Sequence, residues 1–118
     1  KTALAVTRSM AYHPEFQHAA AEMTIAIEAM GPHVDRIADD WSNGVDHGHE
    51  WPSKIVALKY HIVESAKRIV DIAMEMSGGG GMFKRNELER LYRDVRALRI
   101  YEGASEVQRL VIARALLG

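Results

Sequence analysis

The chain has 118 residues, of which 47% are apolar, a net charge of −1 and no cysteine. This length and composition predict one domain with a sizeable hydrophobic core. The balanced charge argues against nucleic-acid or membrane-surface binding driven by net charge, and the lack of thiols excludes disulfides and cysteine-based metal or redox chemistry. No apolar stretch approaches the roughly 18 residues of a membrane span.

The first twelve residues, with Leu4, Val6 and Met10, are predicted to be the end of an earlier helix. They include no starting methionine, and Arg8 interrupts an apolar region too short for a secretory signal. We therefore expect the chain to be a single helical domain, residues 1–118, from the C-terminal part of a larger protein.

A long helix is predicted to begin near Pro14 and Glu15, because proline suits the first turn. At Gly31 and Pro32 we expect a kink rather than an end, since the apolar stripe continues beyond them. The stripe consists of Phe16, Ala20, Met23, Ile27, Val34, Ile37 and Trp41. Residues 42–50 are polar and contain glycine, which predicts a loop.

The segment that follows Pro52 has helical periodicity and ends at Gly78, a good helix stop. Its apolar stripe is Ile55, Leu58, Ile62, Ala66, Ile69, Ala73 and Met76. A third helix is predicted from the spacing of Leu88, Leu91, Val95 and Leu98. Asn86 and Glu89 have the spacing of a capping box at its start.

The last predicted helix runs from Ser105, a candidate N-cap, to Leu117. No segment alternates strongly enough to predict a strand. Three or four amphipathic helices of these lengths predict an all-α fold, an antiparallel four-helix-bundle type of domain.

Glu102 is the first candidate catalytic residue, because it lies on a short link just before the last helix. Tyr101 and Ile100 are large and partly apolar, so we expect them to shield the carboxylate from water, which suits a general base. Gly103 frees the backbone to aim the side chain. The alternative is an ordinary surface glutamate.

A run of four glycines, Gly78 to Gly81, is longer than a helix cap needs. Backbone without side chains lets a flat ring or a pyrophosphate approach closely, and we expect it to lie near Glu102. No Gly-Lys-Ser/Thr follows and no strand precedes, so the run is neither a P-loop nor a dinucleotide fingerprint. The alternative is a flexible helix end.

Two charged clusters are weaker candidates. One is a row of arginines on the third helix, for which a salt-bridged surface competes with a subunit or anionic-ligand contact: Arg90, Arg93, Arg96 and Arg99. The other is the one metal-like cluster, His47 and His49 with Asp46 and Glu50. It lacks the i, i+4 spacing of a helical zinc site, so we predict no metal.

These blocks resemble the C-terminal domain of the acyl-CoA dehydrogenases, flavoenzymes that oxidise acyl-CoA thioesters. The family's pattern is a helix ending in Gln-x-x-Gly-Gly-x-Gly, then Glu-Arg-Leu-Phe/Tyr-Arg-Asp, then Ile-Tyr-Glu-Gly-Thr-Ser-Glu-Ile-Gln-Arg-Leu. Residues 75–81, 89–94 and 100–110 correspond to these blocks without gaps. Glu75 replaces the usual Gln, and Ala104 replaces the usual Thr.

The resemblance implies that Glu102 is the base that removes the α-proton, while the β-hydrogen leaves as a hydride to FAD. Its own backbone N–H and the flavin's ribityl chain would polarise the thioester carbonyl. The substrate contacts would include Tyr101 and Gly103. The FAD contacts would be Glu75, Gly78, Gly79, Ala104 and Glu106, and the glycine run would face the FAD of a partner subunit.

The same resemblance implies an acyl-CoA substrate, an electron-transfer flavoprotein or another acceptor, and a homodimer or homotetramer. Association would cover the apolar side chains of the last helix: Val107, Leu110, Val111 and Leu117. No nucleic-acid or membrane partner is expected, and a bacterial cytoplasm is favoured over the mitochondrial matrix. The 118 residues alone are expected neither to hold FAD nor to turn over acyl-CoA.

Three alternatives stay open at this point. The first is a non-catalytic oligomerisation module in which the motif is idle, which Glu75 and Ala104 favour. The second is a monooxygenase-like branch of the same family. The third, a histidine-dependent metal bundle, is disfavoured by the spacing of the ligands.

Overall fold

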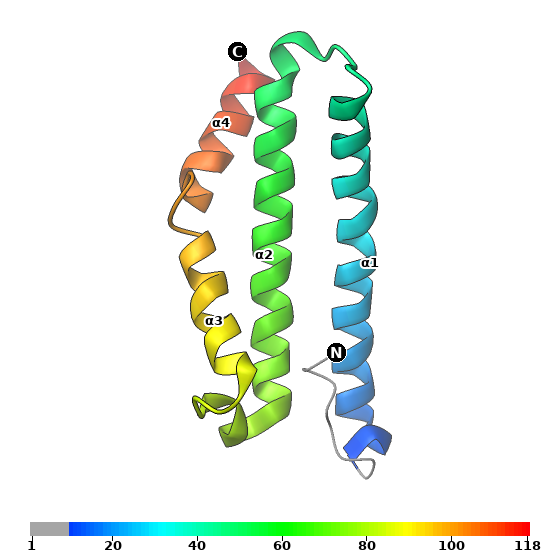
Figure 1. Cartoon of the computed structure of the whole chain (residues 1–118), viewed down its shortest axis with the longest axis vertical. Helices are drawn as coiled ribbons and strands as arrows, with labels where there is room; N and C mark the ends of the chain where they lie inside the picture. Colours follow the sequence, from blue (N-terminus) through cyan, green and yellow to red (C-terminus); the bar gives the residue numbers. More distant parts are fainter. Residues whose placement is uncertain (1–9) are drawn as a thin grey trace.

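The computed structural model describes residues 10–118, which form an all-α domain (Figure 1). The α-helices are α1 (Pro14–Ser42), α2 (Trp51–Ser77), α3 (Glu87–Leu98) and α4 (Ser105–Leu117). Short 3-10 helices occur at Met10–Tyr12, Gly48–Glu50 and Gly78–Met82. The all-α prediction is confirmed. The helix end expected over residues 1–12 lies mostly outside the described residues.

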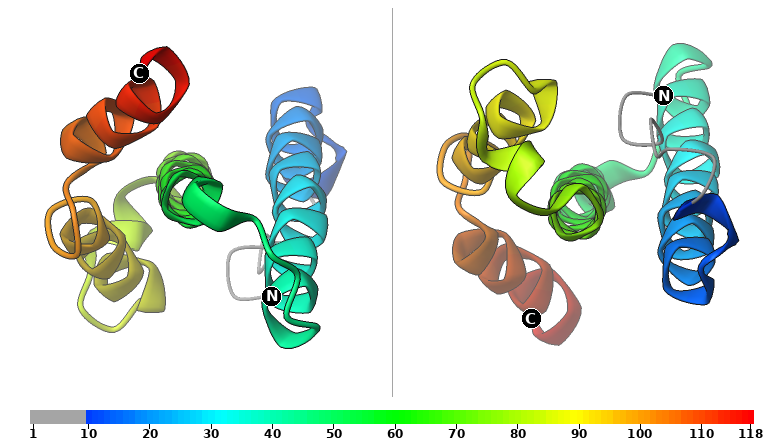
Figure 2. Two further views of the ribbon diagram at one scale, coloured as in Figure 1. Left: turned by 90° about the horizontal axis from the view of Figure 1, so that it is seen from above. Right: turned by 90° about the horizontal axis from the view of Figure 1, so that it is seen from below.

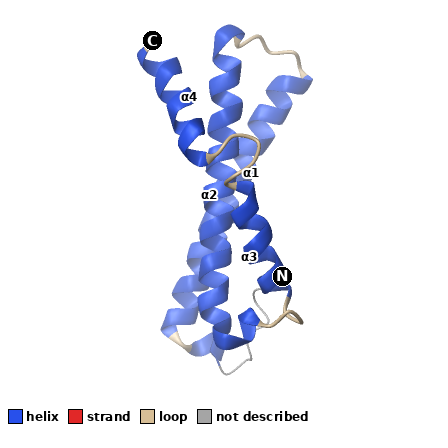
Figure 3. Ribbon diagram, turned by 90° about the vertical axis from the view of Figure 1, so that its left-hand side faces the viewer, coloured by secondary structure: helices blue, strands red, loops and turns tan. Residues whose placement is uncertain are grey.

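The four helices form three columns, and α2 is the central one (Figures 1 and 2). The antiparallel α1 packs along one side of α2, while α3 and α4 follow each other along the other side. The domain is elongated, with extents of 53 × 25 × 25 Å. The link between α3 and α4 therefore lies near the middle of α2 (Figure 3). Within residues 10–118, no helix has the length and apolarity needed to span a membrane.

The helix boundaries follow local signals in the sequence. Pro14 begins α1, and Gly78, with φ +54°, caps the end of α2. The helix α1 continues through Pro32 as a single element, so this proline does not end it. Asn86 caps α3 by accepting a hydrogen bond from Leu88 N–H.

Two of the predicted caps were wrong in detail. The Asn86 N–H donates to the Phe83 carbonyl at 2.7 Å, and the Glu89 carboxylate accepts from Arg93 Nε at 2.7 Å, so Glu89 does not complete a capping box with Asn86. Ser105 is the first residue of α4 rather than its N-cap, which is Ala104. The Ser105 hydroxyl instead donates to Glu64 of α2 at 2.7 Å. In both cases a charged partner takes the group that the local pattern had assigned to the backbone.

The hydrophobic core lies where α1, α2 and α3 meet. Met23, Ala73 and Leu88 are buried at its centre, one from each helix. Side chains packed against them are Ile69, Ile72, Met74, Met76 and Leu91. Val63 and Val70 of α2 are buried as well, outside the single predicted stripe. Because α2 packs against two columns, it is buried on more than one face.

A histidine pair joins α1 to α2 above this core. The Nδ1 atoms of His33 and His61 are 3.0 Å apart, and the two rings are tilted with centroids 5.3 Å apart. Burial is the main cause that holds the pKa of His33 below its usual value, and the nearby His61 and Arg36 add to it. The folded domain therefore favours a neutral His33.

This histidine predicts acid sensitivity. The unfolded chain, with a histidine pKa of about 6.5, binds this proton more readily than the fold does. The free energy of unfolding should fall as pH drops below about 6.5. In the His33→Gln variant this decrease of the free energy of unfolding with falling pH should be smaller. Thermal midpoints measured from about pH 8 to pH 5 test this, because Glu64, whose pKa is also lowered, loses charge only below about 4.3. His18→Gln, on the exposed face of α1, is the control. An unchanged slope in the His33 variant would contradict the assignment.

Two glycines of the run, Gly80 and Gly81, should differ in how much an alanine destabilises the fold. Gly81 is buried, and an added Cβ would collide with the Ser77 hydroxyl and lie 3.0 Å from Met74 Sδ. At Gly80 an added Cβ meets nothing within 4 Å. We expect Gly81→Ala to destabilise the fold by about 1–3 kcal/mol and Gly80→Ala to change it by less than about 0.5 kcal/mol. Equal thermal midpoints for the two variants would refute this.

Candidate active site

The link between α3 and α4 presents Glu102 from an unusual backbone conformation. Glu102 has φ +57°, and within residues 10–118 it is the one non-glycine residue with a positive φ. Gly103 follows with φ +89°. The left-handed region costs a side-chain-bearing residue roughly 1–2 kcal/mol. Such residues persist where surrounding contacts hold them, and they concentrate at functional sites.

Lys59, near the middle of α2, supplies the closest of these contacts. Its ammonium donates to the carbonyl of Tyr101 at 2.7 Å, to that of Gly103 at 3.1 Å, and to that of Glu102 between them. One half-buried cation thus binds three consecutive carbonyls of the link. Hydrogen bonds from a charged donor are stronger than neutral ones, so Lys59 is a firm anchor.

Glu64, one and a half turns further along α2, holds the two ends of the link. Its Oε1 accepts from Arg99 Nε at 2.8 Å and from the Ser105 hydroxyl at 2.7 Å. Burial alone would raise the pKa of Glu64, but the hydrogen bonds from Ser105 and Arg99 outweigh it and lower that pKa. The carboxylate is therefore ionised at neutral pH, and it attaches both ends of the link to α2.

Gln108 of α4 is the third anchor. It is almost fully buried, at 4% exposure, and its Nε2 donates to the Gly103 carbonyl at 2.7 Å. Its Oε1 is buried without a hydrogen-bond partner among the described residues. Gly103 O therefore receives two donors, Gln108 and Lys59, which fixes the peptide between Gly103 and Ala104.

A groove of about 290 Å³ lies between α2 and α4 beside the link. Its lining is mostly apolar and comprises Ile55, Val56, Lys59, Glu102, Gly103, Val107, Gln108 and Val111. The link thus places a carboxylate-bearing residue against an apolar wall, an arrangement typical of sites for largely apolar small molecules.

The Glu102 side chain is exposed, and so are its two neighbours. Ile100 is 64% and Tyr101 is 51% exposed, so the expectation that they shield the carboxylate is wrong for the described residues. No described residue makes an ion pair or hydrogen bond with the Glu102 carboxylate. Its oxygens are left free to accept a proton from a bound molecule.

The glycine run lies at the far end of α3 from Glu102 (Figure 1). Over its 12 residues α3 rises about 18 Å, so the expectation that the two sites lie close together is wrong within one chain. Gly78 and Gly79 are exposed, and an added Cβ at either would meet nothing within 4 Å. Their backbone is open to a flat partner, whereas Gly81 serves packing.

The remaining FAD candidates are spread over two regions. Glu75 is exposed near the end of α2, beside the glycine run. Ala104 is half-buried at the N-cap of α4, and Glu106 follows in its first turn, 3.5 Å from Arg109. One chain therefore presents the candidates at two separate places.

The two charged clusters have structural partners. Three of the row's arginines form ion pairs, including Arg93 with Glu89 at 2.7 Å and Arg99 with Glu64 at 2.8 Å. His47 Nε2 lies 2.8 Å from Asp40 Oδ2, and its ring meets Trp51 edge-on, which closes the turn between α1 and α2. Over residues 10–118 the structure brings together no group of three or more His, Asp or Glu side chains suited to a metal ion.

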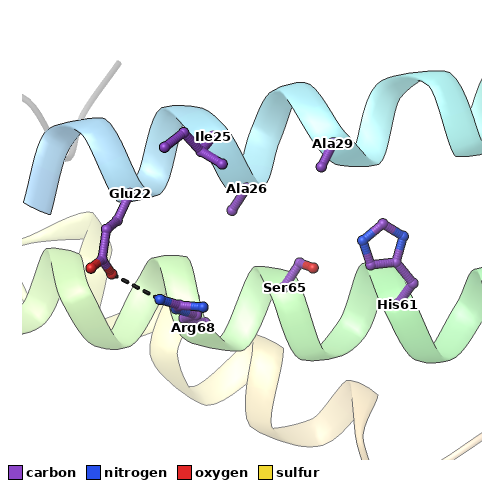
Figure 4. A pocket seen from close by; sticks show the side chains of 7 residues that line it. All are labelled: Glu22, Ile25, Ala26, Ala29, His61, Ser65 and Arg68. Carbon is purple, nitrogen blue, oxygen red and sulfur yellow. Dashed lines mark hydrogen bonds and ion pairs between the residues drawn. The ribbon is translucent and has the colours of Figure 1, made fainter.

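A second groove, of about 300 Å³, lies between α1 and α2 (Figure 4). The ion pair between Glu22 and Arg68, 2.9 Å apart, spans one end of it. Ala26 and Ala29 of α1 and Ser65 of α2 line it from opposite sides, and their short side chains leave space between the helices. The titratable groups at this end are paired with each other, in contrast to Glu102.

Sequence reasoning missed the residues that hold the link. Lys59 and Glu64 lie on α2 outside the matched blocks, and Gln108, although it lies within the block of residues 100–110, was given no role. Lys59 and Glu64 are two of several charged residues of α2, which also carries Lys54, Lys67, Arg68, Asp71 and Glu75, so no signal in the sequence singles them out.

Together, the fold and the link define a helical-bundle domain that presents one unpaired carboxylate beside an apolar groove. The sequence profile of the acyl-CoA dehydrogenase C-terminal domain matches residues 1–117. The chain belongs to the acyl-CoA dehydrogenase family, as its C-terminal domain.

Individual relatives cover both oxidative and reductive enzymes. The chain is 48% identical over 73 residues to 3-(aryl)acrylate reductase of Clostridium sporogenes, which covers 62% of this chain and 19% of that protein. It is 52% identical over 72 residues to the mitochondrial short-chain specific acyl-CoA dehydrogenase of Bos taurus, which covers 61% and 18%. It is 31% identical over 106 residues to cyclohexane-1-carbonyl-CoA dehydrogenase of Geobacter metallireducens, which covers 89% and 27%. The chain thus spans only a minor part of each relative.

The Glu64 anchor yields a stability prediction. Glu64→Gln removes the charge that accepts from Arg99 and Ser105, so we expect a loss on the order of 1–2 kcal/mol, since the site is partly exposed. Because the folded pKa of Glu64 is lowered, this difference should be present at neutral pH and disappear as pH falls below about 4. Chemical denaturation of the wild type and the variant, at neutral pH and at a pH below about 4, measures this difference in the free energy of unfolding. Glu50→Gln, at an exposed glutamate that pairs with Lys54, is the control, and an equal effect there would contradict the anchor.

Proposed function

We propose that the protein carrying this chain is a FAD-dependent acyl-CoA dehydrogenase that oxidises acyl-CoA thioesters to 2-enoyl-CoA, with Glu102 as the catalytic base. One observation carries the proposal: the unpaired Glu102 carboxylate is held on a strained link by Lys59, Glu64 and Gln108, beside an apolar groove. Holding a free base at a fixed place is what proton abstraction from carbon requires.

The backbone of the link supports a second role. Among the described residues, the N–H of Glu102 makes no hydrogen bond. It is therefore free to donate to the thioester carbonyl of a substrate whose α-carbon loses a proton to the same residue's carboxylate. A donor at that oxygen stabilises the negative charge that develops there. Tyr101 and Gly103, on either side, would contact the substrate.

FAD, when bound, would accept the β-hydrogen as a hydride. The open backbone at Gly78 and Gly79 fits close approach by a flat ring system or a pyrophosphate, because no side chain stands in the way. Glu75 fits less well, since its carboxylate would face a negatively charged pyrophosphate. Ala104 and Glu106 would contact a flavin cofactor from the other end of α3.

The separation of these two regions supports a site shared between subunits. Since α3 lies between them, a single flavin ring cannot touch both Glu102 and Gly79 of one chain. We therefore propose that the glycine run serves the FAD of a partner subunit in a homodimer or homotetramer. The exposed apolar residues of α4 are consistent with association: Val107, Leu110, Leu116 and Leu117. An electron-transfer flavoprotein or another acceptor would reoxidise the flavin, in the cytoplasm of a bacterium.

The reverse direction is a second candidate. The relative from Clostridium sporogenes is named as a reductase of an arylacrylate, a compound with an α,β-double bond. In that direction a protonated Glu102 would deliver the proton to the α-carbon instead of removing it. The residues and their geometry are the same in both directions, so the electron donor or acceptor decides between them.

A non-catalytic oligomerisation module is a further alternative, beside a monooxygenase-like branch of the same family, and Glu75 and Ala104 are the residues that favour the module. FAD retained by the purified full-length protein would exclude this alternative. Loss of FAD in the presence of an intact fold would support it.

The main prediction concerns Glu102→Gln in the full-length protein. Glutamine keeps the shape and hydrogen bonding but cannot take a proton. A general base contributes on the order of 10²–10⁴ in rate, so flavin reduction by acyl-CoA should fall by at least that range with FAD content unchanged. Stopped-flow absorbance of the flavin measures it.

The control is Glu28→Gln, the same change on the exposed face of α1. It should reduce flavin at the wild-type rate. If Glu102→Gln also does so, the base lies elsewhere.

A further inference from the structure

We propose that Lys59 is a positioning residue that sets the direction of both the Glu102 carboxylate and the Glu102 N–H. The inference rests on the proposed role of Glu102 as the base. Its ground is the binding of one ammonium to the carbonyls of Tyr101, Glu102 and Gly103. An ammonium has three donors, which matches three acceptors.

Peptide geometry turns this contact into a direction. All peptide bonds among the described residues are trans, so the C=O and N–H of one peptide point in opposite directions. The peptide between Tyr101 and Glu102 directs its carbonyl at Lys59, and its N–H, which belongs to Glu102, therefore points away from α2. The peptide between Glu102 and Gly103 directs its carbonyl at Lys59 as well, so the N–H of Gly103 also points away from α2.

The same contact accounts for the positive φ of Glu102. Three consecutive carbonyls can face one cation only where the backbone turns sharply, and the turn occurs at Glu102 and Gly103, with φ +57° and +89°. Glycine tolerates this region, whereas glutamate needs contacts that hold it there. Lys59 binds the carbonyls on both sides of the Glu102 Cα, so it fixes the residue from which the carboxylate projects.

Lys59 differs in this respect from the other anchors. Glu64 holds Arg99 and Ser105, at the two ends of the link, and Gln108 holds Gly103. Only Lys59, among the described residues, contacts the carbonyl of Glu102 itself. Removing Lys59 should therefore change the aim of Glu102 while the link stays attached. No described carboxylate lies within ion-pair distance of Lys59, so its charge is directed to these carbonyls.

The test uses the full-length protein with FAD bound. Lys59→Met removes the charge and the donors but keeps a long apolar side chain, and Lys59→Arg keeps the charge and several donors. Lys54→Met, on the same helix at a half-buried lysine that pairs with the exposed Glu50, is the matched control. Two quantities are measured. The first is the rate of flavin reduction at a saturating concentration of a straight-chain acyl-CoA, for which we choose, from chains of four to sixteen carbons, the thioester that the wild type oxidises fastest. The second is the rate of amide hydrogen exchange in the segment 100–105.

We expect Lys59→Met to slow flavin reduction about 10- to 100-fold, the scale of a small misplacement of a catalytic group. Hydrogen exchange in residues 100–105 should become faster, with FAD content and KM little changed. Lys59→Arg should recover most of the rate, and Lys54→Met should match the wild type. In a Glu102→Gln background, Lys59→Met should cause no further fall, since no base remains to be aimed.

The following outcomes overturn the inference. Faster exchange with a normal rate would make Lys59 only an anchor, and a slower rate with unchanged exchange would mean that Lys59 acts directly on the substrate. A normal rate in Lys59→Met beside an impaired Glu102→Gln overturns the positioning role alone, whereas a normal rate in Glu102→Gln overturns the assignment of the base. If Lys59→Met does not fold, Lys59→Gln replaces it. We expect Lys59→Gln to reduce flavin at a rate between those of the wild type and the Glu102→Gln variant, and a wild-type rate of flavin reduction would refute the proposal.

Discussion

The structure depends on the burial of α2 between two columns of helices. A helix packed on two sides must present apolar residues on both, and Ala73 and Val70 do this for the columns formed by α1 and α3. The polar residues that remain within such a helix need partners. Lys59 and Glu64 find theirs in the link that carries Glu102, so the helix that organises the core also positions the candidate base.

Sequence patterns predicted the helices well, because their ends are set locally. Pro14, Gly78 and Asn86 act through their own backbone geometry or through a neighbour two or three residues away. The role of Ser105 was predicted wrongly for the opposite reason, whereas that of Glu89 was predicted wrongly because Arg93, one turn further along α3, takes its carboxylate. Each has a competing charged partner, and for Ser105 that partner, Glu64, is 41 residues away in the chain. Spacing along the sequence carries no information about such a contact.

The candidate site was predictable only in part for the same physical reason. A short glycine-containing link identified Glu102, and the family motif around it is continuous in sequence. The anchors come from two other elements, and their importance appears only when α3 and α4 are placed along α2. The expectation for the glycine run was wrong in the opposite way. The run and the link that carries Glu102 belong to one family pattern and were expected to lie close together, but the helix α3 separates them.

Glu102 is exposed, and its neighbours do not shield it, so the described residues supply direction rather than a dry environment. Direction and desolvation are separable requirements of a carbon base: the first depends on the backbone that carries the carboxylate, the second on whatever excludes water around it. The link meets the first through strain held by three anchors. Under the proposed function, the second would come from a substrate or another surface that covers the groove beside Val107 and Val111. The chain spans a minor part of the relatives that it matches, and under the proposed function the part it contributes is the fixed direction of the base rather than the exclusion of water.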